Sequence, residues 1–116
     1  MALLSVIVAI ALASQPLAIW SSSDTSLGQE LQQAFERAVG ASSKFQPVIS
    51  PQGDAPSLLV EKMQFVGEDV SFSVRVFAGL PHRSDEIWSF SETCPREELD
   101  RCAADVVERL PDFSER

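Results

Sequence analysis

The sequence predicts an α+β domain in which two helices pack on one face of a mainly antiparallel sheet of three or four strands. Three observations lead to this prediction: a helix-period apolar stripe after residue 26, a second stripe before residue 111, and alternating apolar and polar residues between them. All three apolar surfaces are buried only if both helices cover the same face of the sheet. The expected order of elements in this 116-residue chain is therefore α-β-β-β-β-α.

The beginning of the chain is typical of an export signal. Residues 2–13 are apolar apart from Ser5, and Ala11-Leu12-Ala13 places small residues where a signal peptidase cleaves. An uncleaved anchor is the alternative, because apolar residues resume at 17–20. Against it, residues 14–16 interrupt the run before it reaches the roughly 20 residues that a membrane span needs. The expected segments are a signal peptide (1–13), a linker (14–25), a single domain (26–111) and a tail (112–116).

The composition is acidic, with 17 Asp and Glu against 9 Lys and Arg and a formal net charge of −8. Proteins bind nucleic acids mainly by neutralising phosphates with Lys and Arg, so a nucleic-acid partner is not expected. For the same reason no contact with an anionic membrane surface is expected once the signal is removed. The charge favours solubility or a basic partner.

The first helix is expected in SLGQELQQAFERAVG. Ser26 and Gln29 have the spacing of a capping box, and Gly40 lies where a helix typically ends. Its apolar residues recur on one side at helical spacing: Leu27, Leu31, Ala34, Phe35 and Ala38.

The strands are expected in the middle of the chain. Lys44–Ile49 is interpreted as a short edge strand, because Pro47 cannot donate a hydrogen bond inside a sheet. LLVEKMQFVGEDVSFSVRVF contains two β-rich runs joined at Gly67-Glu68, which suits a type II′ hairpin turn. Pairing outward from this turn places Phe65 opposite Val70, Met63 opposite Phe72, Glu61 opposite Val74 and Leu59 opposite Val76.

This register gives the hairpin one apolar and one largely polar face. Glu61 is the single charged residue on the apolar face. The opposite, outer face carries Leu58, Val60 and Phe77. These three apolar residues are predicted to form part of a contact surface for a partner.

A third long strand and a second helix complete the expected fold. EIWSFSE alternates in polarity, and Trp88 and Phe90 share one of its faces. Pro111 ends the closing helix, and acidic residues crowd its first half. The apolar stripe of this helix consists of Leu99, Cys102, Ala103, Val106 and Leu110.

The order of these elements resembles the small α/β module of bacterial envelope proteins, of the type found in the amino-terminal domain of TolB and in the curli secretion protein CsgG. The similarity covers roughly Leu27 to Leu110: a helix, a weak strand after Lys44-Phe45, the DAPSLLVEKMQF strand with its hairpin partner, and EIW before a last helix. The Cys94–Cys102 pair departs from that pattern. The resemblance implies protein contacts in envelope assembly and transfers no catalytic residues.

Cys94 and Cys102 are the two cysteines of the chain, and an exported protein is expected to join them in a disulfide. A helix beginning at Pro95 would place their Cα atoms roughly 12 Å apart, beyond the ~7 Å that a disulfide spans. Either the pair is reduced, or the helix begins later and residues 95–98 loop back; we predict the second. A redox role lacks the usual two-residue spacing, and a zinc site lacks ligands because His82 is the single histidine.

The predicted function is an exported, non-catalytic module, periplasmic or secreted, that binds another protein of the cell envelope. The contact surface is expected on the outer sheet face described above, or at the edge strand Lys44–Ile49 by strand addition. The sequence contains no catalytic constellation, phosphate-binding loop or metal motif, so neither a cofactor nor a metal is expected.

Two alternatives stay open. One is a small enzyme or ligand-binding domain with a groove between helices and sheet that uses Glu61, Trp88 or His82. In that case Glu61 is a partly buried acid, whereas otherwise its carboxylate reaches water or Arg75. The other alternative is a disulfide-stapled inhibitor or effector, in which the Pro-His-Arg turn at 81–83 is the reactive loop.

Overall fold

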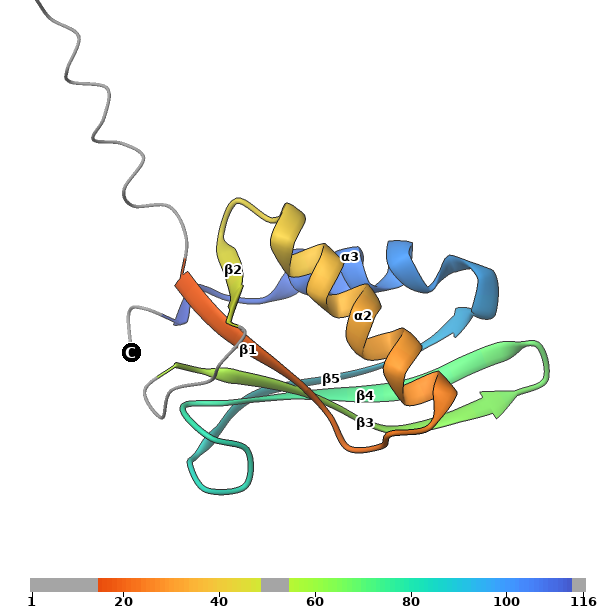
Figure 1. Cartoon of the computed structure of the whole chain (residues 1–116), viewed down its shortest axis with the longest axis horizontal. Coiled ribbons are helices and arrows are strands. Elements are labelled where there is room, and N and C mark those ends of the chain that lie inside the picture. Colours follow the sequence, from red (N-terminus) through yellow and green to blue (C-terminus); the bar gives the residue numbers. More distant parts are fainter. Residues whose placement is uncertain (1–14, 49–54, 114–116) are drawn as a thin grey trace, which may run out of the picture.

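The computed structural model describes residues 15–48 and 55–113, which form one mixed sheet with two helices on the same face (Figure 1). The predicted α+β class, with both helices on one face, is confirmed. The expected signal peptide, residue 49 of the expected edge strand and the end of the expected tail lie outside the described residues. The elements are β1 (Gln15–Ser21), α2 (Ser26–Ala41), β2 (Phe45–Val48), β3 (Ser57–Val66), β4 (Asp69–Phe77), β5 (Glu86–Pro95), the 3₁₀ turn η1 (Arg96–Glu98) and α3 (Leu99–Arg109).

In the described part of the chain the sheet has five strands, in the order β2-β1-β3-β4-β5, rather than the predicted three or four. The additional strand is β1, which runs parallel to β2 and β3 in the middle of the segment predicted to be a linker (14–25). The linker prediction was therefore wrong. Leu17 and Ile19 of β1 belong to the main core. A continuous apolar run is typical of a strand covered on both faces, and here it follows the apolar residues of the predicted signal after only three intervening residues.

The end of the chain also belongs partly to the fold. Phe113, in the segment predicted to be a tail, is buried, and its ring centroid lies 6.1 Å from that of Phe45 on β2. The Lys44 ammonium donates a hydrogen bond of 2.8 Å to the Leu110 carbonyl oxygen just after α3. The domain therefore extends to residue 113, beyond the predicted boundary at 111.

A β-bulge in β3 sets which side chains face the helices. Near the turn the pairs are the predicted ones, such as Phe65 with Val70, but beyond Gln64 the register shifts and Glu61 pairs with Ser73. The extra residue is at Lys62, whose φ of 57° lies in the left-handed region. The shift reverses the faces of the first half of β3. The predicted pairs of Glu61 with Val74 and Leu59 with Val76 are wrong; the observed pairs are Val60 with Val74 and Leu58 with Val76.

The buried side chains of the two helices form the part of the core that packs against the inner face of the sheet. The Thr25 side chain caps α2 by accepting a hydrogen bond from the Gly28 N–H, one residue before the expected cap at Ser26. Phe35 of α2 meets Phe72 of β4 edge to face, with ring centroids 5.9 Å apart. These contacts bury the apolar stripe of α2 against the inner face of the sheet.

A smaller apolar cluster covers part of the outer sheet face. Leu59 and Phe77 are buried there, although they point away from the helices. The Trp20 indole N–H donates to the Ser57 hydroxyl at 3.2 Å, which joins β1 to β3 on this face. The connection between β4 and β5 lies on the same side, opposite the helices (Figure 1), so the sheet is covered on both faces at this end.

Candidate functional site

The two cysteines form a disulfide, as predicted. Cys94, near the end of β5, is joined to Cys102, in α3, with a Cα–Cα distance of 6.5 Å. Residues 96–98 form the 3₁₀ turn, and α3 begins only at Leu99, so the chain loops back as the length argument required. Both cysteines are buried, and the bond fastens the last strand to the last helix.

Glu61 lies on the outer sheet face and not among the core side chains. Its Oε2 atom is 3.1 Å from Arg75 Nη1, and Arg75 Nε is 2.8 Å from Glu86 Oε1. The hydrogen bonds to Glu86 and then to Glu61 raise the pKa of Arg75 above its ordinary value. Although the Glu61 side chain is only 12% exposed, its charge is compensated, and it reaches Arg75 as the simpler interpretation expected.

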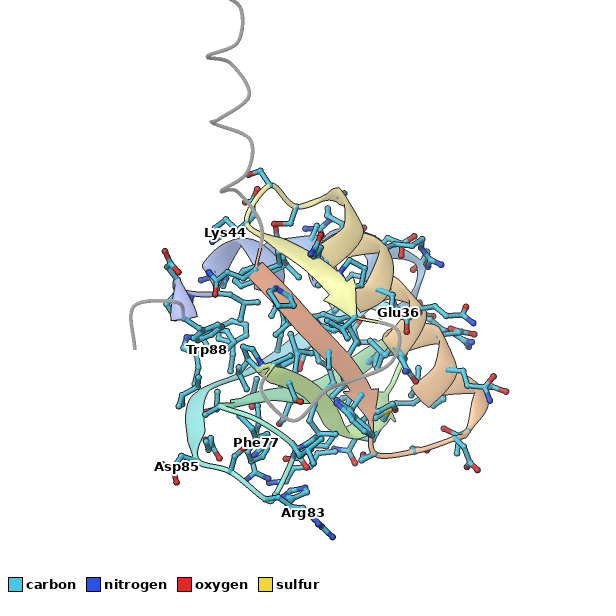
Figure 2. The ribbon with its side chains drawn as sticks, turned by 60° about the vertical axis from the view of Figure 1, so that its left-hand side comes forward. Glu36, Lys44, Phe77, Arg83, Asp85 and Trp88 are labelled. Atoms are coloured by element: carbon cyan, nitrogen blue, oxygen red, sulfur yellow. A yellow bond between two sulfur atoms is a disulfide. The ribbon has the colours of Figure 1, made fainter. Side chains whose placement is uncertain are left out.

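His82 and Trp88 do not share a groove with Glu61 between the helices and the sheet. His82, with φ at 61°, lies in the β4–β5 connection, and its ring meets Phe77 at 5.2 Å on the outer side. Figure 2 shows Phe77, Arg83 and Asp85 gathered at this end of the molecule. Trp88 pairs with Val76 and faces the helices, so it lies on the opposite side of the sheet.

The contact surface predicted from Leu58, Val60 and Phe77 is wrong. Leu58 and Val60 have no exposed surface, because the bulge turns both side chains into the main core. Phe77 does lie on the outer face, but it is only 2% exposed because the β4–β5 connection covers it. None of the three side chains is free to meet a partner.

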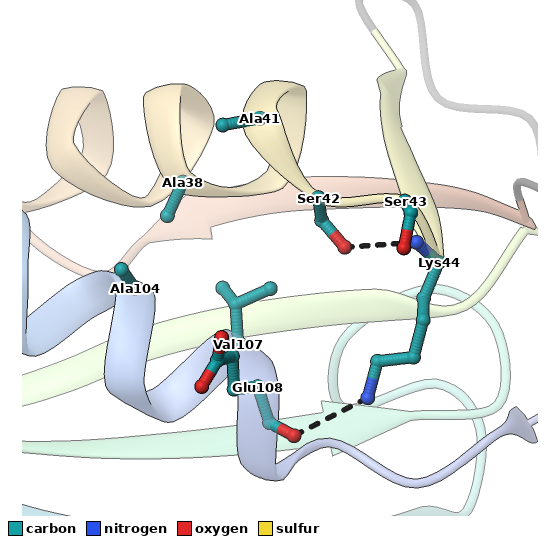
Figure 3. Close-up of a pocket in the computed structure, with 8 residues that line it drawn as sticks. All are labelled: Ala38, Ala41, Ser42, Ser43, Lys44, Ala104, Val107 and Glu108. Carbon is teal, nitrogen blue, oxygen red and sulfur yellow. Dashed lines mark hydrogen bonds between the residues drawn. The ribbon is translucent and has the colours of Figure 1, made fainter.

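A shallow groove of about 560 Å³ runs between the end of α2 and α3 (Figure 3). Its walls are small side chains, including Ala38, Ala41 and Ala104. The cation at its edge, Lys44, already donates to the carbonyl oxygens of Glu108 and Leu110, which satisfies the end of α3. The groove is lined mainly by small side chains, and Lys44 and Glu108 are its two charged lining residues.

The tip of the β3–β4 hairpin carries the exposed large apolar side chains of the described residues. Phe65 is 54% and Val66 is 51% exposed. The Arg96 guanidinium lies 5.2 Å from the centroid of the Phe65 ring, and it also pairs with Glu30 at 3.0 Å. A groove of about 470 Å³ separates this tip from the start of α2.

The feature that sequence reasoning missed is the free edge of β5. β5 is the last strand of the sheet, ten residues long, with proline only at its end. The stacked rings of Trp88 and Phe90, 5.9 Å apart, lie half-buried on its helix-facing side. The signal was present in EIWSFSE, which alternates in polarity without an internal proline, but the sequence does not show which strand is at the edge.

Within residues 15–48 and 55–113 no group of three or more His, Cys, Asp or Glu side chains has the arrangement of a metal site. No helix in these ranges combines the length and apolar character needed to cross a membrane.

No protein-family model and no curated protein matches the sequence. Among solved structures, the fold is similar to that of protein XCC0632 from Xanthomonas campestris, described with the family model DUF330. The TM-score is 0.56 at 10% identity, over 81% of this chain and 82% of that chain. The likeness is weaker for a PelC variant from Paraburkholderia phytofirmans (TM-score 0.46, 14% identity, 79% of each chain) and for a minor lipoprotein from Acinetobacter baumannii (0.47, 12%, 82% and 89%). At 10% identity the likeness to XCC0632 shows a shared fold alone. The resemblance to the TolB and CsgG module stays a prediction.

Proposed function

We propose that this chain is an exported, non-catalytic module of a bacterial cell envelope, periplasmic or secreted, that binds another envelope protein. The observation that carries the proposal is the buried disulfide between Cys94 and Cys102, which fixes β5 to α3. Such bonds form and persist in oxidising compartments outside the cytosol. The apolar first 13 residues, with their small-residue cleavage motif, provide the matching route of export.

The arrangement of β1 supports cleavage rather than anchoring. The apolar residues 17–20, which prompted the anchor alternative, lie in a strand between β2 and β3, where 17–19 are buried and Trp20 is half-buried. They belong to the domain and do not extend the apolar signal. Cleavage after Ala13 leaves β1 intact.

The contacts of the candidate catalytic residues support a binding role. Glu61 is paired with Arg75, and the His82 ring rests against Phe77. Each has a structural partner, and the two are not directed with Trp88 into one groove. The open edge of β5, beside two half-buried aromatic rings, is instead the kind of surface on which proteins add a strand.

Fractionation and intact-mass measurement of the full chain in its native host test the export part. We expect the protein in the envelope or medium, lacking residues 1–13 and gaining the mass of two hydrogens on reduction. Ala13→Leu, which enlarges the residue before the cleavage point, is the matched control and should retain the signal. A full-length chain with free thiols in the cytosol would contradict the proposal.

Chemical cross-linking in intact cells, followed by denaturing purification, tests the binding part. We expect a defined heterologous adduct with one envelope protein at native abundance. Recovery of the monomer alone would count against a binding role even if export is correct.

A further inference from the structure

We propose that the free edge of β5 is the binding site, and that its occupant is an extended, basic segment of the partner protein that adds to the sheet as a sixth strand. This inference rests on the proposed function and specifies the surface and the partner chemistry. In this arrangement the apolar side chains of the segment cover Trp88 and Phe90, and a Lys or Arg of the segment faces Glu92.

The register of β4 and β5 shows which peptide groups are free. The Arg96 N–H donates to the Glu68 carbonyl oxygen, and hydrogen-bonded pairs recur every second residue in an antiparallel ladder. The peptide groups of Cys94, Glu92 and Phe90 therefore point to β4. Those of Ser89, Ser91 and Thr93 point outward, and no hydrogen bond from another described residue reaches their N–H or carbonyl groups.

The side chains along this edge suit an added strand. On the helix side, Trp88 and Phe90 stack at 5.9 Å and are only half-buried, and Arg109 of α3 covers the Phe90 ring at 5.1 Å. An added strand places alternate side chains beside these two rings, because neighbouring strands lie about 4.8 Å apart. On the other side the edge presents small hydroxyl side chains, which do not hinder approach.

The acidic side chains along this edge favour a basic segment as the occupant. Glu92 follows the two aromatic rings on the helix side of the edge, because it pairs with Phe72 of the core. Glu86 lies on the outer face, because the register of β5 shifts between Trp88 and Glu86. Glu86 is paired with Arg75, whereas Oε1 of Glu92 is shielded from water and has no hydrogen-bond partner. Arg101 is the cation that interacts with Glu92 electrostatically, but its hydrogen bonds go to Glu98. A buried oxygen without a hydrogen-bond donor is unfavourable. In the complex, a Lys or Arg of the added strand donates this missing hydrogen bond to Glu92.

A second copy of the chain fits this edge less well. Two copies paired through β5 would bring the same acidic residues, Glu92 among them, to both sides of the new ladder, and each chain carries a formal charge of −8. Like charges directly opposite each other destabilise a strand pair. The other sheet edge, β2, is four residues long and contains Pro47, which limits strand addition there.

The test begins with Ser89→p-benzoylphenylalanine, which places a photoreactive group on the edge in intact cells. The expected product is an adduct with an envelope protein whose cross-linked peptide contains Lys or Arg and alternating apolar residues. A synthetic peptide of that sequence is then titrated against the purified, oxidised domain. Hydrogen exchange should show the Ser89, Ser91 and Thr93 amides unprotected in the free domain and protected in the complex, whereas those of Phe90 and Glu92 are protected in both.

Variants of the purified domain separate strand addition from other contacts. Ser91→Pro removes an outward N–H without touching the β4 ladder, and Ser91→Ala is its matched control, because it retains the N–H. We expect Ser91→Pro to weaken peptide binding by about tenfold or more and Ser91→Ala to leave it unchanged. Glu92→Lys should weaken it by a similar factor without altering the backbone, so the test does not depend on the stability of the proline variant.

Each contrary result overturns a different statement. Unchanged binding by Ser91→Pro with its disulfide intact means that the edge is not used, while the proposed function stands. Full binding by Glu92→Lys, or a cross-linked segment without Lys or Arg, removes the basic occupant. Adducts between two copies identify self-pairing instead. Two negative results together would contradict the proposed function as well. These are no adduct from a photoreactive group at any position along β5, and recovery of the monomer alone after general chemical cross-linking.

Discussion

Glu61 and Arg75 face each other on the outer side of the sheet, with Oε2 of the acid 3.1 Å from Nη1 of the base. This contact exists because β3 contains one residue more than β4 between Glu61 and Gln64. Without the extra residue the alternation from the hairpin turn would direct the Glu61 carboxylate at the core. The bulge therefore removes a charge from the apolar face and places Leu58 and Val60 there in its stead.

Lys62 carries the backbone strain of this bulge, since its φ of 57° is unfavourable for a side chain with a Cβ atom. We expect Lys62→Gly to increase the free energy of unfolding by ~0.5–1 kcal/mol, because relief of this strain outweighs the greater freedom of glycine in the unfolded chain. Lys62→Ala is the matched control: it removes the exposed side chain, keeps the strain and should bring no gain. Urea denaturation of both variants measures the difference, and equal effects of the two substitutions would contradict the strain argument.

The bulge also explains where reasoning from the sequence failed. Phe65, Gln64 and the turn at Gly67 were placed correctly, because the turn sets the register of its neighbours. The inserted residue cannot be recognised from the alternation of apolar and polar residues. Leu59 and Val60 are both apolar, so either of them could face the core. The predicted register therefore assigned the side chains in the first half of β3 to the wrong faces of the sheet. For this reason Leu58 and Val60 were predicted to form a contact surface, although both face the core.

The cysteine pair and the helices could be predicted because their constraints are local. The separation of Cys94 and Cys102 required a late helix start, whatever the rest of the fold. β1 could not be predicted in the same way. Residues 15–21 form a strand because they pair with β2 and β3, and both partner strands lie much later in the chain. The free edge of β5 likewise depends on the order of strands in space.

Gly28 allows the close approach of the β1–α2 connection to the first turn of α2. A Cβ atom at this position would collide with the Ser23 carbonyl oxygen, whereas a Cβ at Gly40 would meet no atom within 4 Å. We expect Gly28→Ala to lower the free energy of unfolding by ~1–3 kcal/mol through displacement of this connection. Gly40→Ala, in the same helix, should be neutral or stabilise by up to ~1 kcal/mol. Thermal unfolding of the pair checks the contrast, and destabilisation of similar size at both positions would show that helix propensity, not the contact with Ser23, decides the outcome.

The disulfide joins β5 to α3 through two cysteines that are eight positions apart in the sequence. We expect the double variant Cys94→Ala, Cys102→Ala to lower the free energy of unfolding by ~2–3 kcal/mol, chiefly because the unfolded chain gains freedom. The reduced wild-type protein, which keeps both cysteine side chains without the bond, is the control that separates loss of the bond from loss of the side chains. Guanidinium denaturation of the oxidised and reduced protein provides the comparison; equal midpoints would mean that packing of α3 holds β5 without the bond.

β1 provides the sharpest test of the fold, because it lies between β2 and β3 and pairs with both. A chain that starts at residue 14 retains the whole strand, and we expect it to unfold cooperatively on heating. A chain that starts at residue 22 lacks Leu17 and Ile19 from the core and leaves β2 without a neighbour, so it should show no cooperative transition. Leu17→Ala in the longer chain is the graded control, with an expected loss of ~2–5 kcal/mol. Circular dichroism follows all three proteins, and a cooperative transition in the shorter chain would show that residues 15–21 are a linker after all.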